Sequence, residues 1–135
     1  MPKPNKSEPG ARKPSRFGRH PQPGYSVKAS IWVERDGQLY LGGGRVTLLE
    51  YLDKLGSISA AARVMGLTYR NAWAWIDSMN RLAASPLVEK TVGGPGGGHA
   101  VLTDEGRKAI AEYQNLREKM SKAVHQDTQE TFYYY

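Results

Sequence analysis

Two short apolar segments meet at Gly66-Leu67-Thr68, and this junction constrains the fold more than any other feature. Ser57 opens the first segment as an expected helix cap, and apolar residues recur at helical spacing over about 69–83 in the second. A helix-turn-helix needs a residue that accepts positive φ at its turn, and a small residue where the helices cross. Gly66 and Ala62 meet these demands. The positions expected to be buried in such a unit are all apolar: Ala61, Met65, Leu67, Ala72 and Trp75.

Any two packed helices with a glycine link would show the same pattern, but the segment that follows Pro86 favours a more specific arrangement. Leu87 to Val92 and His99 to Leu102 flank a glycine-rich loop, Gly93 to Gly98, and this pattern predicts a β-hairpin. A hairpin directly after a recognition helix is the wing of a winged helix-turn-helix. Its glycines can approach a phosphate backbone closely, because they carry no side chain.

The flanking segments predict one more hairpin and two more helices. Alternating residues interrupted by Asp36-Gly37 predict a hairpin over 27–41 with a type I′ turn. Gly42-Gly43-Gly44 is expected to break regular structure before a helix of about 45–55, which Gly56 ends. Thr103 is expected to cap a helix of about 104–125, whose apolar stripe is Ala109, Tyr113, Leu116, Met120 and Ala123. The predicted fold class is mainly α with small β hairpins, in a winged helix-turn-helix.

Charge is unevenly distributed along the 135 residues, which carry a formal charge of +6 and no Cys. Residues 1–24 hold six basic residues against one acidic residue and repeated Pro, so we expect a disordered basic arm. Residues 25–126 are expected to form the winged helix-turn-helix domain with its C-terminal helix, and 127–135 a tail. The net positive charge makes nucleic acid the first partner to consider.

Several classes of protein are disfavoured. No stretch approaches the roughly 20 apolar residues of a membrane span, and no secretory signal is visible, so we expect a cytoplasmic protein with no membrane partner. The glycine-rich loop lacks the Lys-Ser/Thr of a nucleotide-binding loop. His20, His99 and His125 have no ligand-like spacing. We therefore expect no enzyme activity, no cofactor and no metal.

The order of several motifs resembles the DNA-binding domain of ModE-type molybdate-responsive regulators. These are Gly44-Arg45-Val46-x-Leu48-Leu49, Gly56-Ser57-Ile58-Ser59-x-Ala61-Ala62, Leu67-Thr68-Tyr69-Arg70-x-Ala72-Trp73, Leu87-Val88-Glu89, the wing at 93–98, and Ala100-Val101-Leu102-Thr103-x-x-Gly106-Arg107. The resemblance covers about residues 27–120, and a more distant likeness to LysR-type domains covers the central helices. It implies a prokaryotic regulator that binds double-stranded DNA as a homodimer.

Two departures from this pattern bear on function. About fifteen residues follow Met120, which leaves no room for the molybdate-binding domains of the familiar regulator, so we do not expect oxyanion sensing and the effector is unknown. Pro95 occupies a wing position where family members often carry Lys or Arg. His99 or Lys90 is expected to substitute weakly for that phosphate contact.

A recognition helix enters the major groove with its N-terminal end leading, so base contacts are expected opposite its buried face. This selects Thr68, Tyr69, Arg70 and Ala74, with Asn71 and Trp73 at the margins. Arg70 can bond guanine bidentately, and Asn71 can bond adenine. Tyr69 could instead bond a phosphate, and Trp73 could simply cover the edge of the core. The remaining DNA-binding candidates are Ser57, Ser59, Lys90, Gly94, Gly96, Gly97 and His99, with Ser57 alternatively only a cap.

Three alternatives stay open at this stage. The apolar stripe of the last helix favours pairing with a symmetry mate, although the helix could also pack wholly on its own domain. The arm could enter a minor groove, neutralise phosphates or remain a solvated tail. An architectural or protein-interaction module is the rival to a specific regulator, because the outward Asp77 would slightly repel phosphate.

Overall fold

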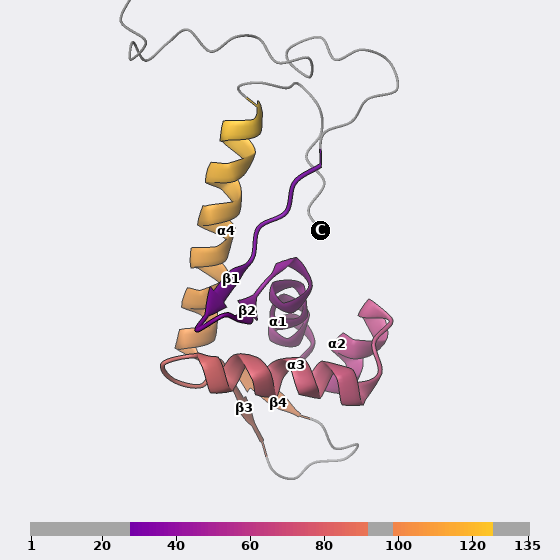
Figure 1. The fold of residues 1–135 in the computed structure, drawn as a ribbon. Helices are drawn as coiled ribbons and strands as arrows, with labels where there is room; N and C mark the ends of the chain where they lie inside the picture. Colours follow the sequence, from indigo (N-terminus) through magenta and orange to yellow (C-terminus); the bar gives the residue numbers. More distant parts are fainter. Residues whose placement is uncertain (1–27, 92–98, 126–135) are drawn as a thin grey trace, which may run out of the picture.

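A computed structural model describes residues 28–91 and 99–125. In chain order its elements are β1 (Val33–Arg35), β2 (Gln38–Leu41), α1 (Gly43–Leu55), α2 (Ile58–Met65), α3 (Tyr69–Leu82), β3 (Val88–Lys90), β4 (Ala100–Leu102) and α4 (Asp104–His125) (Figure 1). The predicted fold class, a mainly helical winged helix-turn-helix with small hairpins, is confirmed. The predicted arm and tail lie outside the described residues.

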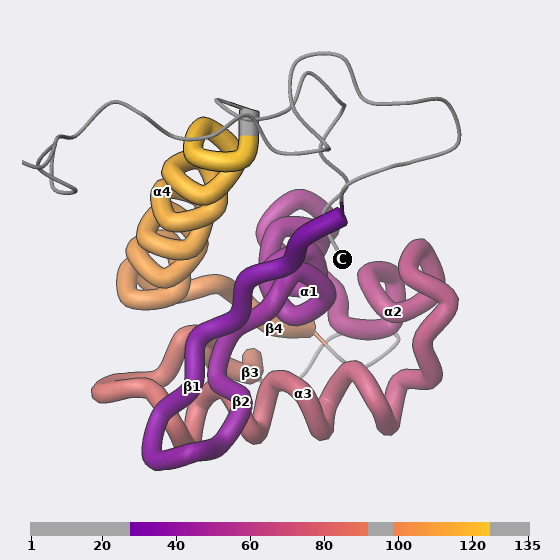
Figure 2. Tube along the Cα trace, turned by 45° about the horizontal axis from the view of Figure 1, so that its top comes forward, coloured from indigo at the N-terminus to yellow at the C-terminus, as the bar shows by residue number. Residues whose placement is uncertain are grey.

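Helix α1 lies at the centre and contacts α2, α3, α4 and β4 (Figures 1 and 2). Helix α3 crosses below α1 in the view of Figure 1, and the β3–β4 hairpin packs on α1 through β4. The core is built from apolar side chains of every element from β2 to α4. Among them, Leu48, Leu49, Ile58, Ile76 and Met79 are fully buried. The other elements are therefore arranged around α1.

The predicted turn between α2 and α3 is confirmed. The Ser57 hydroxyl accepts a hydrogen bond from the Ala60 amide at 3.2 Å, and Gly66 ends α2 with φ 68°. Thr68 then caps α3, because its hydroxyl accepts from the Asn71 amide at 3.1 Å. Ala62 is buried, as a close crossing requires. One expectation is wrong in degree: Met65, Leu67 and Trp75 are only partly buried, and they pack against the margin of the core.

The first hairpin has the predicted turn but shorter strands. Asp36 and Gly37 have φ values of 51° and 76°, as a type I′ turn requires. Pairing begins only at Val33, not at 27, and its register shifts between Val33 and Glu34. Residues 28–32 belong to no strand, and the Tyr113 hydroxyl of α4 donates to the Ile31 carbonyl at 2.9 Å. Burial raises the pKa of the Tyr113 phenol, with Arg117 opposing the rise, so this donor keeps its proton at neutral pH.

Helix α1 begins at Gly43, so the prediction that the glycine triplet breaks regular structure is wrong. The first amides of a helix need no intrahelical acceptor, and Gly42 supplies an extended N-cap. A Cβ at Gly44 would lie 3.4 Å from the Trp75 ring, which is the short limit of ordinary van der Waals contact, so α1 and α3 lie close together here. Arg45 then donates to the Leu39 carbonyl at 2.8 Å and to the Ser78 hydroxyl at 3.1 Å, and burial lowers the pKa of its guanidinium. It therefore joins α1 to β2 and α3.

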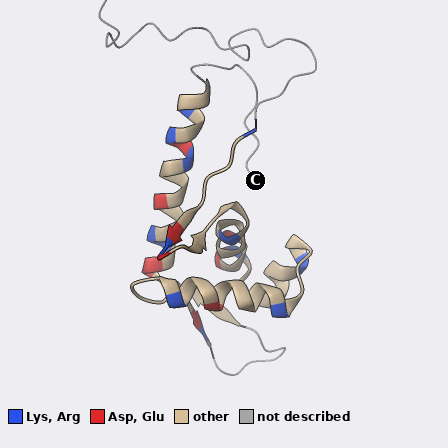
Figure 3. Cartoon of the chain, viewed as in Figure 1, with Lys and Arg blue, Asp and Glu red and all other residues tan. Residues whose placement is uncertain are grey.

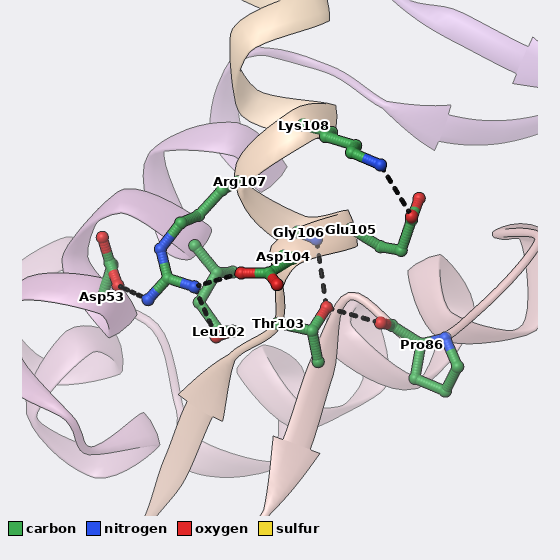
Figure 4. Close-up of polar contacts among 9 residues, drawn as sticks. All are labelled: Asp53, Pro86, Leu102, Thr103, Asp104, Glu105, Gly106, Arg107 and Lys108. Atoms are coloured by element: carbon green, nitrogen blue, oxygen red, sulfur yellow. Dashed lines mark hydrogen bonds and ion pairs between the residues drawn. The ribbon is translucent and has the colours of Figure 1, made fainter.

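The start of α4 is bonded to the residues at the base of the second hairpin (Figure 4). The Thr103 hydroxyl donates to the Pro86 carbonyl at 2.6 Å and accepts from the Gly106 amide at 3.1 Å, which confirms the predicted cap. Arg107 bridges Asp104 and Asp53, both at 3.4 Å. A Cβ at Gly106 would overlap the Leu87 carbonyl oxygen and lie 2.6 Å from Leu102 Cδ1. Gly106 is thus the close contact between α4 and the base of the hairpin.

We predict that Gly106→Ala lowers the free energy of unfolding by about 1–3 kcal/mol, because the added methyl group overpacks a site bounded by backbone. Chemical denaturation followed by circular dichroism measures the change. Gly44→Ala is the matched control, since its Cβ meets only ring atoms at 3.4 Å, and it should change stability by less than about 1 kcal/mol. Equal effects at the two positions would contradict the prediction.

Candidate nucleic-acid interface

One face of α3 is exposed along its whole length. Ala72, Ile76 and Met79 are fully buried, which leaves Arg70, Ala74, Asp77 and Arg81 on the solvent side. Tyr69 and Asn71 are exposed at the N-terminal end, beside Arg70. Thr68 is exposed as well, although its oxygen also serves as the cap. The structure therefore brings Thr68, Tyr69, Arg70, Asn71 and Ala74 together at one end of the helix.

Charges alternate along this face (Figure 3). Asp77 forms an ion pair with Arg81 at 3.6 Å, one helical turn away, and both side chains are largely exposed. Arg70 makes no ion pair or side-chain hydrogen bond within the part of the chain that the structure describes. Asp77, the one acidic residue of this face, is thus paired in the C-terminal half of α3. The Arg70 guanidinium in the N-terminal half is available for an external acceptor.

The strands of the predicted wing lie beside this face. Strands β3 and β4 pair antiparallel, with Val88 opposite Leu102 and Lys90 opposite Ala100, and the Thr91 amide donates to the His99 carbonyl at 3.0 Å. His99 also forms an isolated antiparallel bridge with Ser57. Two site candidates, Ser57 and His99, therefore lie together where the hairpin meets the start of α2.

Two other candidates contact each other. The Lys90 ammonium lies 4.1 Å from the centroid of the Trp73 ring, so the hairpin and α3 meet at this pair. Trp73 is half-buried and packs against the core, in agreement with the expectation that it could cover the core edge. Ser59 is half-buried in the first turn of α2. Gly94, Gly96 and Gly97 lie outside the described residues, so their positions stay predictions.

Asn80 is a residue of this region that the sequence analysis missed. Its side-chain oxygen accepts from the amides of Leu87 and Val88 at 2.9 and 3.2 Å, and its nitrogen donates to the Val88 carbonyl at 3.0 Å. It thereby fastens the start of β3 to α3. The available signal was its position four residues after the buried Ile76, because a polar residue beside an apolar stripe needs a specific partner.

The described residues also line an apolar hollow of about 420 Å³ between the first hairpin, α1 and α3. Arg45 is its single ionisable lining residue, and that guanidinium is already bonded to protein acceptors. Residues 28–91 and 99–125 contain no group of three or more His, Asp or Glu side chains that could hold a metal ion. Their helices include none with the length and apolar character needed to cross a membrane.

Comparison with known proteins shows what this arrangement resembles. Residues 45–107 match the family described as bacterial regulatory helix-turn-helix protein, lysR family. The turn, the exposed α3 face and the adjoining hairpin all lie in this span or border it. Residues 45–107 are therefore similar in sequence to bacterial regulatory helix-turn-helix domains.

The chain is also similar in sequence to curated proteins of the ModE type. It is 46% identical over 94 residues to the molybdenum-pterin-binding protein MopB of Rhodobacter capsulatus, covering 70% of this chain and 34% of MopB. It is 38% identical over 107 residues to the molybdenum transport protein ModE of Azotobacter vinelandii, covering 74% and 40%. It is 41% identical over 86 residues to the DNA-binding transcriptional dual regulator ModE of Escherichia coli K12, covering 64% and 33%. The chain thus spans at most 40% of these relatives.

A solved structure also matches the chain. The match is to the crystal structure of a LysR family transcriptional regulator, with a TM-score of 0.45 and 22% sequence identity. The aligned region covers 58% of this chain and 25% of the regulator's chain.

We predict that Asn80→Ala lowers the free energy of unfolding by about 1–3 kcal/mol, because backbone groups of the buried Leu87 and Val88 lose their partners. Urea denaturation measures the change. Asn115→Ala, at an exposed position of α4, should stay within about 0.5 kcal/mol of the wild type. If Asn80→Ala were equally mild, the three bonds would have no measurable role in stability.

Proposed function

We propose that this chain is a sequence-specific regulator of transcription that binds double-stranded DNA. The N-terminal half of α3 enters the major groove, and the β3–β4 hairpin lies along the sugar-phosphate backbone. Arg70 reads guanine, Asn71 reads adenine, and Thr68, Tyr69 and Ala74 complete the contact with the bases. Ser57, Ser59 and His99 contribute phosphate contacts at the adjoining start of α2. The basic arm neutralises further phosphates, and the protein acts in the cytoplasm.

The observation that carries this proposal is the exposed end of α3. Helix α3 presents an arginine that has no ion pair among residues 28–91 and 99–125, flanked by two polar side chains, beside a hairpin bonded to the same helix. The relatives include one whose name is DNA-binding transcriptional dual regulator, which agrees with this role. Catalysis is not part of the proposal, since the described hollow offers no pair of acid and base groups.

The rival is an architectural winged helix that binds DNA without sequence preference, and a selection experiment separates the two. Duplexes are selected from a random-sequence library on the purified chain, and the selected duplex is compared with a scrambled duplex of equal composition at physiological salt. A specific regulator should prefer the selected duplex by at least about a thousandfold. A ratio near one favours the architectural module. Repeating the titration with molybdate tests whether this segment responds to an oxyanion.

We predict that Arg70→Ala weakens binding to the selected duplex by about 1–3 kcal/mol and relaxes preference at one base pair, because a bidentate contact to guanine is lost. Fluorescence anisotropy with single-base variants of the duplex measures both effects. Arg81→Ala is the control from the same face, because its guanidinium already pairs with Asp77 and it lies three turns from Arg70. Unchanged affinity and base preference in Arg70→Ala would remove Arg70 from the readout.

We also propose that α4 pairs with its counterpart in a second copy. Ala109 and Tyr113 are buried within the domain, but the same stripe continues with Leu116, which is 41% exposed, then Met120 and Ala123. The C-terminal part of α4 extends beyond α1 in Figure 1, and along it Leu116 and Ala123 are exposed and Met120 is half-exposed. A symmetric dimer would space two recognition helices about 34 Å apart and read an inverted repeat.

We predict that Leu116→Glu shifts the chain from dimer to monomer, because it places a charge in an apolar contact between two helices. Sedimentation velocity at several protein concentrations measures the shift. Asn115→Glu introduces the same charge at the neighbouring exposed position and should leave the dimer intact. A monomeric wild-type chain, or equal behaviour of the two variants, would count against the helical pairing.

A further inference from the structure

The β3–β4 hairpin is joined to α3 along one side of the helix. The two α3 side chains that hold it, Trp73 and Asn80, lie seven residues apart, which is about two helical turns and places them on the same side. Asn80 bonds to the backbone of Val88, and Trp73 lies beneath the ammonium of Lys90. The start of β3 is therefore joined to the C-terminal half of α3, and the Lys90 side chain at its end reaches the half of the helix that carries Arg70.

The two attachments differ in kind. The Asn80 contact uses three hydrogen bonds to the buried start of β3, at Leu87 and Val88. The Lys90 contact lies at the other end of the strand, where the lysine is exposed and the half-buried Trp73 ring is held against the core. An ammonium 4.1 Å from a ring centroid is well inside the roughly 6 Å over which the ring attracts a cation. The Trp73 ring thus packs on the core, and the Lys90 ammonium lies over its exposed part.

We propose that Lys90 and Trp73 are a positioning pair, which sets the direction of the β3–β4 hairpin relative to the recognition helix. Lys90 then contributes to DNA binding through Trp73 and not as a phosphate contact of its own. Because the hairpin is already oriented in the free protein, less ordering is required when both elements meet one duplex. This inference rests on the proposed function, and it differs from the sequence expectation that Lys90 substitutes weakly for a phosphate contact of the wing.

Two observables distinguish a positioning pair from a phosphate contact. Removal of a lysine that neutralises a phosphate reduces the slope of log affinity against log salt by about 1, whatever residue occupies position 73. Removal of a lysine that acts through the ring leaves that slope unchanged and has no further effect once the ring is gone. The second pattern is a non-additive double-mutant cycle.

The experiment uses the full chain and the selected duplex, with Lys90→Met, Trp73→Leu and the double variant titrated at four salt concentrations. Lys90→Met keeps an unbranched stem over the ring but removes the charge, and it should weaken binding by about two- to fivefold with an unchanged salt slope. In the Trp73→Leu background the same change should have no effect. Lys90→Arg should retain wild-type affinity, because a guanidinium also stacks on an aromatic face.

Control variants test whether the effect is specific to Lys90 and Trp73. Lys54→Met removes an exposed lysine from the last turn of α1 and should leave affinity unchanged. Trp73→Phe replaces Trp73→Leu if the latter fails to fold, and it should give a partial loss. In the free protein, NMR should show the Lys90 methylene protons shifted upfield by the ring, and the shift should vanish without the indole.

The possible failures are distinguishable. A salt slope lowered by about one unit in Lys90→Met, equal losses in both backgrounds, or no upfield shift would overturn the positioning pair while the wild-type protein still bound its selected duplex. A wild-type chain that binds no duplex would instead overturn the proposed function, and this inference with it.

Discussion

Burial of one stripe of α3 is the interaction on which the rest of the structure depends. Ala72, Ile76 and Met79 are completely inaccessible to solvent, so the rotation of α3 about its axis is determined by the core. Helical geometry then places Arg70, Ala74 and Asp77 on the opposite side without any further interaction. The candidate DNA-binding face is therefore a consequence of apolar packing on the side that does not bind DNA.

Polar contacts act differently, because they set the angles of the two hairpins, which apolar packing alone does not determine. Arg35 of the first hairpin donates to the Leu82 carbonyl at the end of α3 at 2.6 Å, and Arg45 joins α1 to β2 and Ser78. Asn80 and Thr103 hold the second hairpin at its base. Short strands have little apolar surface of their own, so directional bonds of this kind decide their angles. A change in these bonds would alter the orientation of a hairpin more than the survival of the core.

Local signals were sufficient wherever one or two residues determine the backbone. Ser57 and Thr103 cap helices as predicted, Gly66 ends α2, and Asp36-Gly37 forms the turn of the first hairpin. The errors fall where distant segments meet. Helix α1 starts at Gly43, where the extended Gly42 serves as its N-cap. The first hairpin is short because the chain before Val33 is bonded to α4 instead.

The sequence by itself determined the succession of helices and hairpins, the turn at Gly66 and the outward position of Arg70, because periodicity, caps and glycines act within a few residues of themselves. The tertiary structure alone decided that Asn80 binds Leu87 and Val88 and that Lys90 lies over Trp73. The partners in the latter contact are 17 positions apart in the chain. Contacts of this kind depend on the angle at which a strand crosses a helix, and no local pattern encodes that angle.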